Sequence, residues 1–209
     1  MNREQLAVYF IAGTPNCPQP IEQVLTEAVA GGITMFQFRE KGEGALTGKA
    51  KKETALRLQA ICRKAGIPFI VNDDIELAVE IGADGVHIGQ EDEAASVVRK
   101  QLTNGIVGVS VHTKDEFKQA IQDGADYVGT GPVYATATKT DTRPVAGTEL
   151  IRWMKQQAPL FPVVGIGGIT LENAGDVFLA GADGISVITA ISMAENPASA
   201  ASYLKKLSL

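Results

Sequence analysis

The chain has 209 residues, of which 45% are hydrophobic and 21% charged, ordinary values for one globular domain spanning residues 1–209. Its net charge of −5 argues against nucleic acid as a partner, because nucleic-acid binding favours a basic face. No apolar run reaches the roughly 18 residues of a membrane span, and the apolar stretch near the N-terminus is too short for a secretory signal. Cys17 and Cys62 form no CxxC pair. We therefore expect a cytoplasmic enzyme with reduced thiols.

Short apolar segments recur along the chain and predict β-strands. The strands are expected at Val8–Ala12, within 30–38, at Ile67–Asp73, within 81–89, at Gly105–Val111, within 123–131, at Phe161–Gly168 and within 180–188. Helix-like segments fill the gaps, for example Glu22–Ala30, Thr47–Ala65 and Leu171–Leu179. Strands that alternate with helices in this way predict a parallel sheet covered by helices.

Four of the strands share one pattern, in which a helix-like run ends in glycine and a short apolar strand follows. The first glycines are Gly31, Gly82, Gly124 and Gly181, and glycine there suits the left-handed residue just after a helix. A doubly wound open sheet is the alternative, but GTPNCPQP after the first strand lacks a nucleotide-binding glycine pattern. Glycines at every second junction favour paired units in a compact single-domain (β/α)8 TIM barrel of the α/β class.

Polar residues gather where the expected strands end, and barrels of this kind carry their active sites at that end. In MFQFREK the side chains alternate between faces, so Gln37, Arg39 and Lys41 share the face toward the barrel mouth. An inward arginine requires an anion nearby, which is either a bound substrate or a barrel carboxylate such as Asp73.

Asp73 and Asp92 follow the third and fourth strands and are expected to converge beside these cations. Two carboxylates suit Mg²⁺, which prefers oxygen ligands and keeps several waters. The same pair is compatible with general acid–base catalysis or with a plain ion-pair network. Asp92 is also placed where it could serve as an N-cap of the next helix. The spacing alone leaves these roles open.

A long segment follows the sixth strand. Residues 129–147 exceed the usual length of a βα turn, and Thr136, Thr138 and Lys139 lie within them. This composition favours an anion-binding lid over a plain surface loop.

The last two strands end in a pattern that suits a phosphate group. Gly168 follows the seventh strand, and Ile188 and Thr189 follow the eighth, where such barrels commonly bind phosphate through backbone amides. A glycine run that only forms a tight turn is the alternative. His87 lies within a strand and is expected to be a hydrogen-bonded core residue, and neither His87 nor His112 is assigned a catalytic role.

Eight motifs in this order resemble the thiamine-phosphate synthases over nearly the whole chain: VYFI, QFREK, VNDD, GVHIGQED, GVSVHT, GADYVGTGPVYATATKTD, VVGIGGI and GADGISVITAI. The resemblance implies condensation of 4-amino-2-methyl-5-hydroxymethylpyrimidine pyrophosphate with a hydroxyethylthiazole phosphate, or its carboxylated form. The products would be thiamine monophosphate and pyrophosphate, formed by a Mg²⁺-assisted dissociative displacement. The implied partners are these small molecules, with no nucleic acid and no membrane. Self-association into a homo-oligomer is indicated only loosely.

The resemblance also implies a role for each motif. Gln37 would contact the aminopyrimidine, and Arg39, Lys41 and Ser110 would face the pyrophosphate. The implied catalytic residues are Ser110, Lys139 and Arg39. The implied substrate-binding residues are Gln37, Arg39, Lys41, Asn72, Ser110, Thr136, Thr138, Lys139, Gly168, Ile188 and Thr189. Asp73 and Asp92 would hold Mg²⁺.

Three other functions compete with this one. A TenI-like thiazole tautomerase has the same barrel and phosphate cradle but would not need the pyrophosphate apparatus. A non-catalytic thiazole-phosphate sensor could lose the metal carboxylates, which this chain retains. A phosphosugar isomerase is disfavoured because no obvious general-base pair is present.

Overall fold

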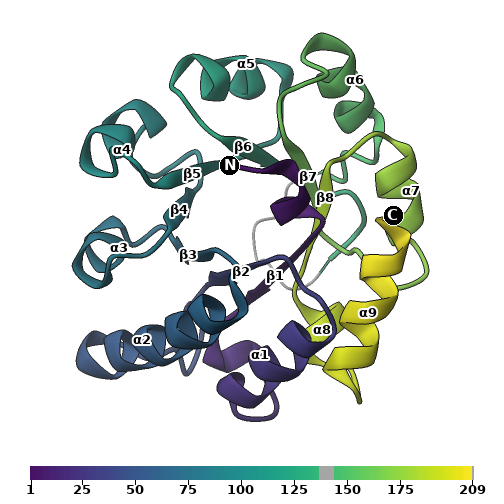
Figure 1. The fold of residues 1–209 in the computed structure, drawn as a ribbon. Helices are drawn as coiled ribbons and strands as arrows, with labels where there is room; N and C mark the ends of the chain where they lie inside the picture. Colours follow the sequence, from purple (N-terminus) through teal and green to yellow (C-terminus); the bar gives the residue numbers. More distant parts are fainter. Residues whose placement is uncertain (137–143, 209) are drawn as a thin grey trace.

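Eight parallel strands close into a barrel in which each strand pairs with its neighbours in chain order and β1 pairs with β8 (Figure 1). The computed structural model describes residues 1–136 and 144–208. The strands are β1 (Val8–Ala12), β2 (Met35–Phe38), β3 (Phe69–Asn72), β4 (Gly85–Ile88), β5 (Ile106–Val111), β6 (Tyr127–Thr130), β7 (Val163–Ile166) and β8 (Gly184–Val187). The expected (β/α)8 barrel is confirmed.

Helices surround the barrel and follow the strands in turn (Figure 1). They are α1 (Ile21–Ala30), α2 (Gly48–Ala65), α3 (Ile75–Ile81), α4 (Ala95–Gln101), α5 (Lys114–Gln122), α6 (Glu149–Gln157), α7 (Ala174–Leu179), α8 (Thr189–Ser192) and α9 (Pro197–Leu207). Two short 3₁₀ turns, η1 (Arg3–Leu6) and η2 (Thr14–Asn16), flank β1. None of the helices within the described residues combines the length and apolar character that crossing a bilayer requires.

The alternation of side chains along each strand divides the core into two layers. Phe36 and Phe38 of β2 face outward and pack with the helices, as expected. Gln37, between them, faces the barrel interior and is 1% exposed. The apolar residues of the interior come from several strands and the two barrel ends: Leu6, Tyr9, Ile11, Met35, Ile70, Tyr127, Val164 and Ile188.

The four sequence repeats form four equivalent hydrogen-bonded contacts at the N-terminal end of the barrel. In each contact, a polar side chain just before an even-numbered strand accepts a hydrogen bond from a backbone amide at the start of the preceding odd-numbered strand. The donor is the first residue of β1, β3 and β7, and the second residue, Val107, of β5. The pairs are Thr34 with Val8 (2.9 Å), Asp84 with Phe69 (2.8 Å), Asp126 with Val107 (2.8 Å) and Asp183 with Val163 (2.8 Å). These contacts join the strands in pairs, which explains why the sequence pattern recurs every second βα unit.

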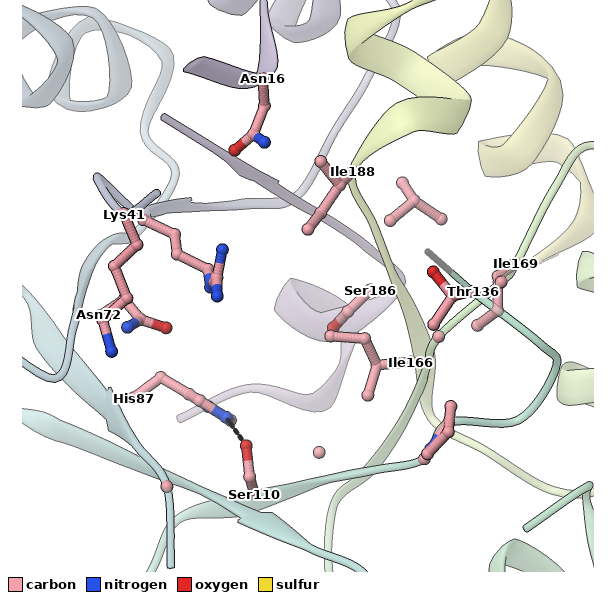
Figure 2. Close-up of a pocket in the computed structure, with 18 of the residues that line it drawn as sticks. Asn16, Lys41, Asn72, His87, Ser110, Thr136, Ile166, Ile169, Ser186 and Ile188 are labelled. Atoms are coloured by element: carbon pink, nitrogen blue, oxygen red, sulfur yellow. Dashed lines mark hydrogen bonds between the residues drawn. The ribbon is translucent and has the colours of Figure 1, made fainter. Parts of the chain in front are cut away.

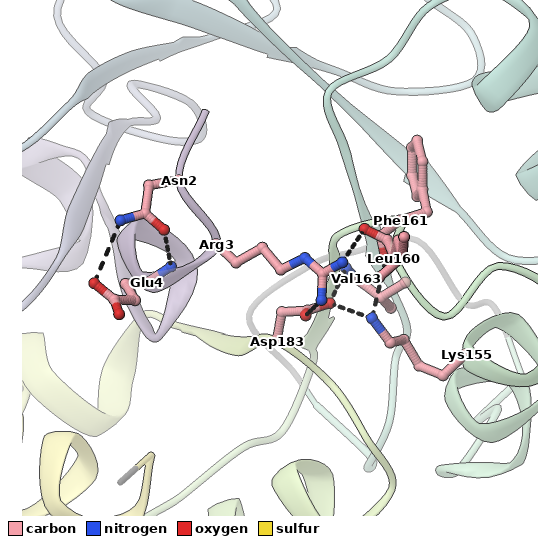
Figure 3. A network of polar contacts seen from close by, with 8 residues as sticks. All are labelled: Asn2, Arg3, Glu4, Lys155, Leu160, Phe161, Val163 and Asp183. Carbon is pink, nitrogen blue, oxygen red and sulfur yellow. Dashed lines mark hydrogen bonds and ion pairs between the residues drawn. The ribbon is translucent and has the colours of Figure 1, made fainter.

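Asp183 makes the most extensive of these contacts (Figure 3). Its carboxylate also accepts from the ammonium group of Lys155 at 2.7 Å and lies 3.6 Å from the guanidinium of Arg3. Arg3 in turn donates to the carbonyl oxygen of Leu160 at 2.5 Å. The turn η1, which carries Arg3, also carries Leu6. Leu6 is fully buried and closes the N-terminal end of the barrel interior.

One expectation about the repeat glycines is wrong. Gly82, Gly124 and Gly181 have positive φ, as predicted, but Gly31 has a φ of −77° and the left-handed residue is Gly32. Gly31 is required for a different reason, because a Cβ there would lie 2.2 Å from the carbonyl oxygen of Ala198 in α9. The close approach of α9 therefore explains why glycine occupies position 31, whereas the left-handed turn after α1 is made by Gly32.

Candidate active site

A cleft of about 910 Å³ opens at the C-terminal ends of the strands. It brings together ten of the residues predicted from the sequence: Arg39, Lys41, Asn72, Asp73, Asp92, Ser110, Thr136, Gly168, Ile188 and Thr189. Gln37 lies deeper, in a small cavity beneath the cleft. Thr138 and Lys139 lie outside the described residues. Figure 2 shows Lys41, Asn72 and His87 on one side of the cleft, with Thr136, Ile169 and Ile188 on the other.

The two cations that follow β2 have different surroundings. Lys41 forms an ion pair with Asp73, and its side chain is 49% exposed. Arg39, whose backbone amide donates to Ala12 at 2.8 Å, makes no ion pair with any residue that the structure describes. The alternative of an Arg39–Asp73 ion pair is therefore wrong, because Lys41, two residues along, occupies that carboxylate. Arg39 presents its charge to the cleft, where an anionic ligand is its natural partner.

The carboxylates of Asp73 and Asp92 lie close enough to interact. Asp73 has a φ of 58°, an uncommon value for a residue with a Cβ, and this backbone turns it into the cleft beside Lys41. Partial burial first, and then the Asp73 carboxylate, raise the pKa of Asp92, against the hydrogen bond from the Gly89 amide, which lowers it.

Asp92 does not cap the following helix. Its carboxylate accepts from the Gly89 amide at 2.7 Å, and α4 begins only after Ala94, which occupies the N-cap position. The N-cap alternative for Asp92 is therefore wrong. The loop instead folds the carboxylate back toward the end of β4, on the side where Asp73 lies.

The donor set at this point fits a magnesium ion. Two carboxylates that repel each other are stabilised by a shared cation, and Mg²⁺ in proteins is commonly held by one or two carboxylates together with waters and substrate phosphates. Within residues 1–136 and 144–208, no group of three or more His, Cys, Asp or Glu side chains offers a complete protein-only metal site. Asp73 and Asp92 therefore suit an ion that completes its shell with phosphate and water.

Glu40 is a residue of this region that the sequence analysis missed. It is 7% exposed, and its carboxylate accepts from the backbone amides of Thr14 and Leu46, both at 2.8 Å, and from the Thr14 hydroxyl. It therefore joins the loop after β1 to the loop after β2, and the second of these loops carries Arg39 and Lys41. The sequence did contain a signal for its burial, because Glu40 is a charged residue in register with the buried Phe36 and Phe38 of MFQFREK.

The opposite side of the cleft is built from glycine and hydroxyl groups. Gly167 and Gly168 have φ values of 96° and 64°, and a Cβ on Gly168 would lie 2.5 Å from the carbonyl oxygen of Ala135. The glycines thus allow close backbone contacts and also line the cleft, and the phosphate cradle stays a prediction. Helix α8 begins at Thr189, with Ile188 in the N-cap position.

The long segment after β6 is closed at its base, where the Ala146 amide donates to the carbonyl oxygen of Pro132 at 2.9 Å. Thr136 lies at the edge of the cleft. Residues 137–143 lie outside the described part of the chain, so the predicted lid stays a prediction. Asn16, another residue that the sequence analysis missed, reaches the cleft from η2, and among the described residues its Oδ1 has no hydrogen-bond partner.

Both histidines bind neighbouring groups near the cleft. His87 is 8% exposed and contacts Tyr127 through Nδ1 at 3.0 Å. Its Nε2 contacts the Ser110 hydroxyl at 2.9 Å (Figure 2). The expectation of a hydrogen-bonded core histidine is confirmed, although the ring also borders the cleft. His112 donates from Nδ1 to the carbonyl oxygen of Gly131 at 2.6 Å, which joins the ends of β5 and β6.

A (β/α)8 barrel with cations and paired carboxylates on one side of its mouth, and a glycine and hydroxyl cradle on the other, is an enzyme scaffold suited to phosphorylated small molecules. The family model described as thiamine monophosphate synthase matches residues 8–191. The chain therefore belongs to the thiamine monophosphate synthase family and is a transferase.

Individual relatives agree with this membership. A thiamine-phosphate synthase of Bacillus thuringiensis (strain Al Hakam) is 56% identical over 191 residues, covering 91% of this chain and 87% of the relative. That of Bacillus mycoides (strain KBAB4) is 55% identical with the same coverage. A solved structure of thiamine phosphate pyrophosphorylase from Pyrococcus furiosus has a TM-score of 0.88 and 34% identity, covering 98% of this chain and 96% of that one.

Proposed function

We propose that the chain joins the aminopyrimidine pyrophosphate to the thiazole phosphate, or to its carboxylated form, and releases thiamine monophosphate and pyrophosphate. With the carboxylated form, the carboxylate leaves as CO₂. The observation that supports this proposal is that one cleft has two differently lined sides, each with groups suited to an anion. Arg39 and Lys41 with two carboxylates suit a pyrophosphate and its metal ion. The cradle that includes Gly168 and Thr189 suits a phosphate monoester.

The proposed reaction breaks the bond between the pyrimidine CH₂ carbon and the pyrophosphate oxygen before the thiazole nitrogen forms its bond to that carbon. The thiazole nitrogen carries no proton, so no general base is required. The bonding electrons leave with the pyrophosphate, and the barrier lies in separating this anion from the pyrimidine cation. Groups that are already oriented toward the departing charge lower such a barrier.

In this mechanism Arg39 supplies a positive charge that no described residue neutralises, and Ser110 supplies a hydroxyl at the end of β5. Asp73 and Asp92 would hold Mg²⁺, which when bound offsets the negative charge of the pyrophosphate. Asn72 is proposed to contact the pyrophosphate as well. Lys139 is proposed as a further cation on the strength of the TATK motif.

The second substrate is proposed to bind by its phosphate to Gly168, Ile188 and Thr189, with Thr136 and Thr138 at the edge. An anchored phosphate fixes the distance from the thiazole ring to the CH₂ carbon, which removes much of the entropic cost of bringing two substrates together. The apolar side chain of Ile188, which lines the cleft, is proposed to give the substrate rings a surface on which to lie.

The proposal is tested by measuring pyrophosphate release with each substrate alone and with both, with and without Mg²⁺, and by mass detection of thiamine monophosphate. We expect product only with both substrates and the metal. Arg39→Gln should reduce the single-turnover rate, and Tyr203→Phe, on the exposed face of α9, should leave it unchanged. Product formed without Mg²⁺ would contradict the metal assignment. Conversion of a thiazole carboxylate phosphate into an isomer, with no condensation, would replace the proposal by a tautomerase.

A further inference from the structure

A continuous chain of hydrogen bonds crosses the barrel interior beneath the cleft and joins two of the predicted substrate-binding residues. Gln37 Nε2 donates to Tyr9 Oη at 2.7 Å, and Tyr9 Oη lies 2.8 Å from Tyr127 Oη. Tyr127 Oη lies 3.0 Å from His87 Nδ1, and His87 Nε2 lies 2.9 Å from Ser110 Oγ. We call these five residues the interior relay. Gln37 and Ser110 are its two ends.

The middle of the interior relay is closed to water. Tyr9 and Tyr127 are 1% and 0% exposed, and their rings meet edge to face with centroids 5.9 Å apart. Burial raises the pKa of Tyr9 and of Tyr127 above their ordinary range, so both phenols keep their protons. Each buried hydroxyl must therefore both donate and accept within the relay, since an unmet buried polar group is costly.

With a neutral His87, this requirement leaves two self-consistent directions. In the first, Gln37 Nε2 donates to Tyr9, Tyr9 to Tyr127, Tyr127 to His87 Nδ1, and His87 Nε2–H to Ser110. The Ser110 proton then remains available to the cleft, and the Gln37 carbonyl oxygen is the end that a ligand meets. In the second direction every donor and acceptor is exchanged. Ser110 then uses its proton within the relay, and Gln37 offers its NH₂ group instead.

Resting on the proposed function, we propose that a pyrophosphate bound at Ser110 selects the first direction and thereby sets the amide of Gln37 to accept a hydrogen bond from the exocyclic amine of the pyrimidine. An anion requires a donor, so Ser110 must direct its proton outward when the anion is bound. The hydrogen-bonded order then passes through His87, Tyr127 and Tyr9 to the far end. The two phenols are positioning residues, because they act on the substrate only through Gln37 and Ser110.

The consequence is specificity for the amino pyrimidine. The carbonyl oxygen of Gln37 can accept a hydrogen bond from the amine of the substrate. In an oxo analogue it would face another oxygen, and because both atoms are acceptors this contact is unfavourable. If the relay only provided hydrogen bonds for buried groups, without a fixed direction, the Gln37 amide could turn over. It would then accommodate either the amine or the oxo group of the pyrimidine. The two cases therefore differ in the tautomer of His87 and in discrimination between the two pyrimidines.

The tautomer is directly measurable because the chain has only two histidines, His87 and His112. Nitrogen-15 NMR of the histidine-labelled protein with Mg²⁺ and inorganic pyrophosphate reports which ring nitrogen carries the proton, and His112→Gln assigns the two rings. We expect His87 as the Nε2–H tautomer. The Nδ1–H tautomer or a doubly protonated ring would overturn the proposal. This outcome does not depend on whether the enzyme makes thiamine monophosphate.

Discrimination is measured as the ratio of kcat/KM for the amino pyrimidine pyrophosphate to that for its oxo analogue. In Tyr127→Phe, Tyr9 Oη loses one of its two relay partners and can either donate to or accept from Gln37, so the Gln37 amide can turn over. We expect the ratio to fall about tenfold, the effect of one buried hydrogen bond, while KM for the thiazole phosphate stays unchanged. Tyr9→Phe should lower the ratio in the same way, and Tyr203→Phe should preserve it.

An unchanged ratio in both relay variants, with wild-type thermal unfolding, would overturn the proposal even though the wild-type enzyme condenses its substrates. If one relay variant fails to fold, the other variant and the tautomer of the wild-type protein decide the matter. A wild-type enzyme without condensation activity would contradict the proposed function, and the histidine tautomer would still report the direction of the relay.

Discussion

The ammonium group of Lys155 lies 2.7 Å from the carboxylate of Asp183, at the end of the barrel opposite the cleft, and both side chains are largely buried at 15% and 10% exposure. The same carboxylate accepts from the backbone amide of Val163. Asp84 makes the equivalent backbone contact with Phe69 but has no ion pair among the described residues. The two aspartates therefore provide a matched comparison within one repeat.

We expect Asp183→Asn to lower the free energy of unfolding by about 3 kcal/mol, because it leaves a buried lysine without its partner. Asp84→Asn should cost about 1 kcal/mol, since its amide oxygen can still accept from Phe69. Urea unfolding of the two variants measures the difference. Equal losses would show that the ion pair adds nothing to the backbone contact.

The two cations after β2 should contribute unequally to pyrophosphate affinity. Arg39 has no ion-pair partner among the described residues, whereas Lys41 must share its charge with Asp73. We expect Arg39→Gln to weaken binding of inorganic pyrophosphate by about tenfold to a hundredfold, the range of a charge-assisted hydrogen bond, and Lys41→Gln to weaken it less. Titration calorimetry with Mg²⁺ present gives both dissociation constants. A larger loss in Lys41→Gln would contradict this order.

Asp92 should strengthen Mg²⁺-dependent ligand binding but lower the stability of the metal-free protein near neutral pH. Its pKa is raised in the folded state, chiefly by partial burial and then by Asp73, so its contribution to stability is present at acid pH and is lost as the pH rises through the folded pKa. Near neutral pH without Mg²⁺, Asp92→Asn should therefore raise Tm slightly, and this gain should vanish on acidification. The same variant should abolish the Mg²⁺ dependence of pyrophosphate binding.

Thermal unfolding at several pH values and calorimetry with and without Mg²⁺ test the two halves of this prediction. Glu91→Gln is the control, because Glu91 lines the same cleft beside Asp92 but is not expected to bind the metal. A lower Tm in metal-free Asp92→Asn would show that the hydrogen bond from Gly89 outweighs the repulsion by Asp73.

Gly168 and Gly124 allow the cost of backbone strain to be separated from the cost of a blocked contact. Both have positive φ, but a Cβ would meet the Ala135 carbonyl oxygen at 2.5 Å only in Gly168, and would have nothing within 4 Å in Gly124. We expect Gly124→Ala to cost about 1 kcal/mol of stability and no ligand affinity. Gly168→Ala should cost more and should weaken thiazole-phosphate binding by displacing the segment that carries Thr136.

Equilibrium unfolding and a binding titration of thiazole phosphate on the two variants test this comparison. Equal stability losses, with phosphate affinity retained in Gly168→Ala, would mean that Gly168 serves a backbone turn without contributing to the cradle.

Much of the architecture could be predicted because its causes are local. The segment Val8–Ala12 forms β1 with the expected bounds, and α2 begins at Gly48 where Thr47 was expected. Apolar alternation and glycine at helix ends act within a few residues, so they are visible in the sequence. The exception is Gly31, where glycine is required by a close contact with α9, about 170 residues further along the chain.

The membership of the cleft could be predicted for a topological reason. Residues that follow the strands of a parallel barrel meet at one end whatever their distance in sequence, and ten of the predicted residues do so. The ion pairs between these residues could not be predicted from the sequence. The sequence offers Arg39 and Lys41 equally to Asp73, and side-chain reach in three dimensions selects Lys41.

The sequence by itself determined the barrel, its paired repeats and the residues at its mouth, because periodicity, glycine positions and strand order express these features within short segments. Only the tertiary structure decided which polar groups meet. Tyr9 and Tyr127 are separated by 118 positions, and their hydroxyls are 2.8 Å apart because the closed barrel points both side chains into the same interior. Hydrogen bonds depend on such distances and directions, and these exist only once the sheet has closed.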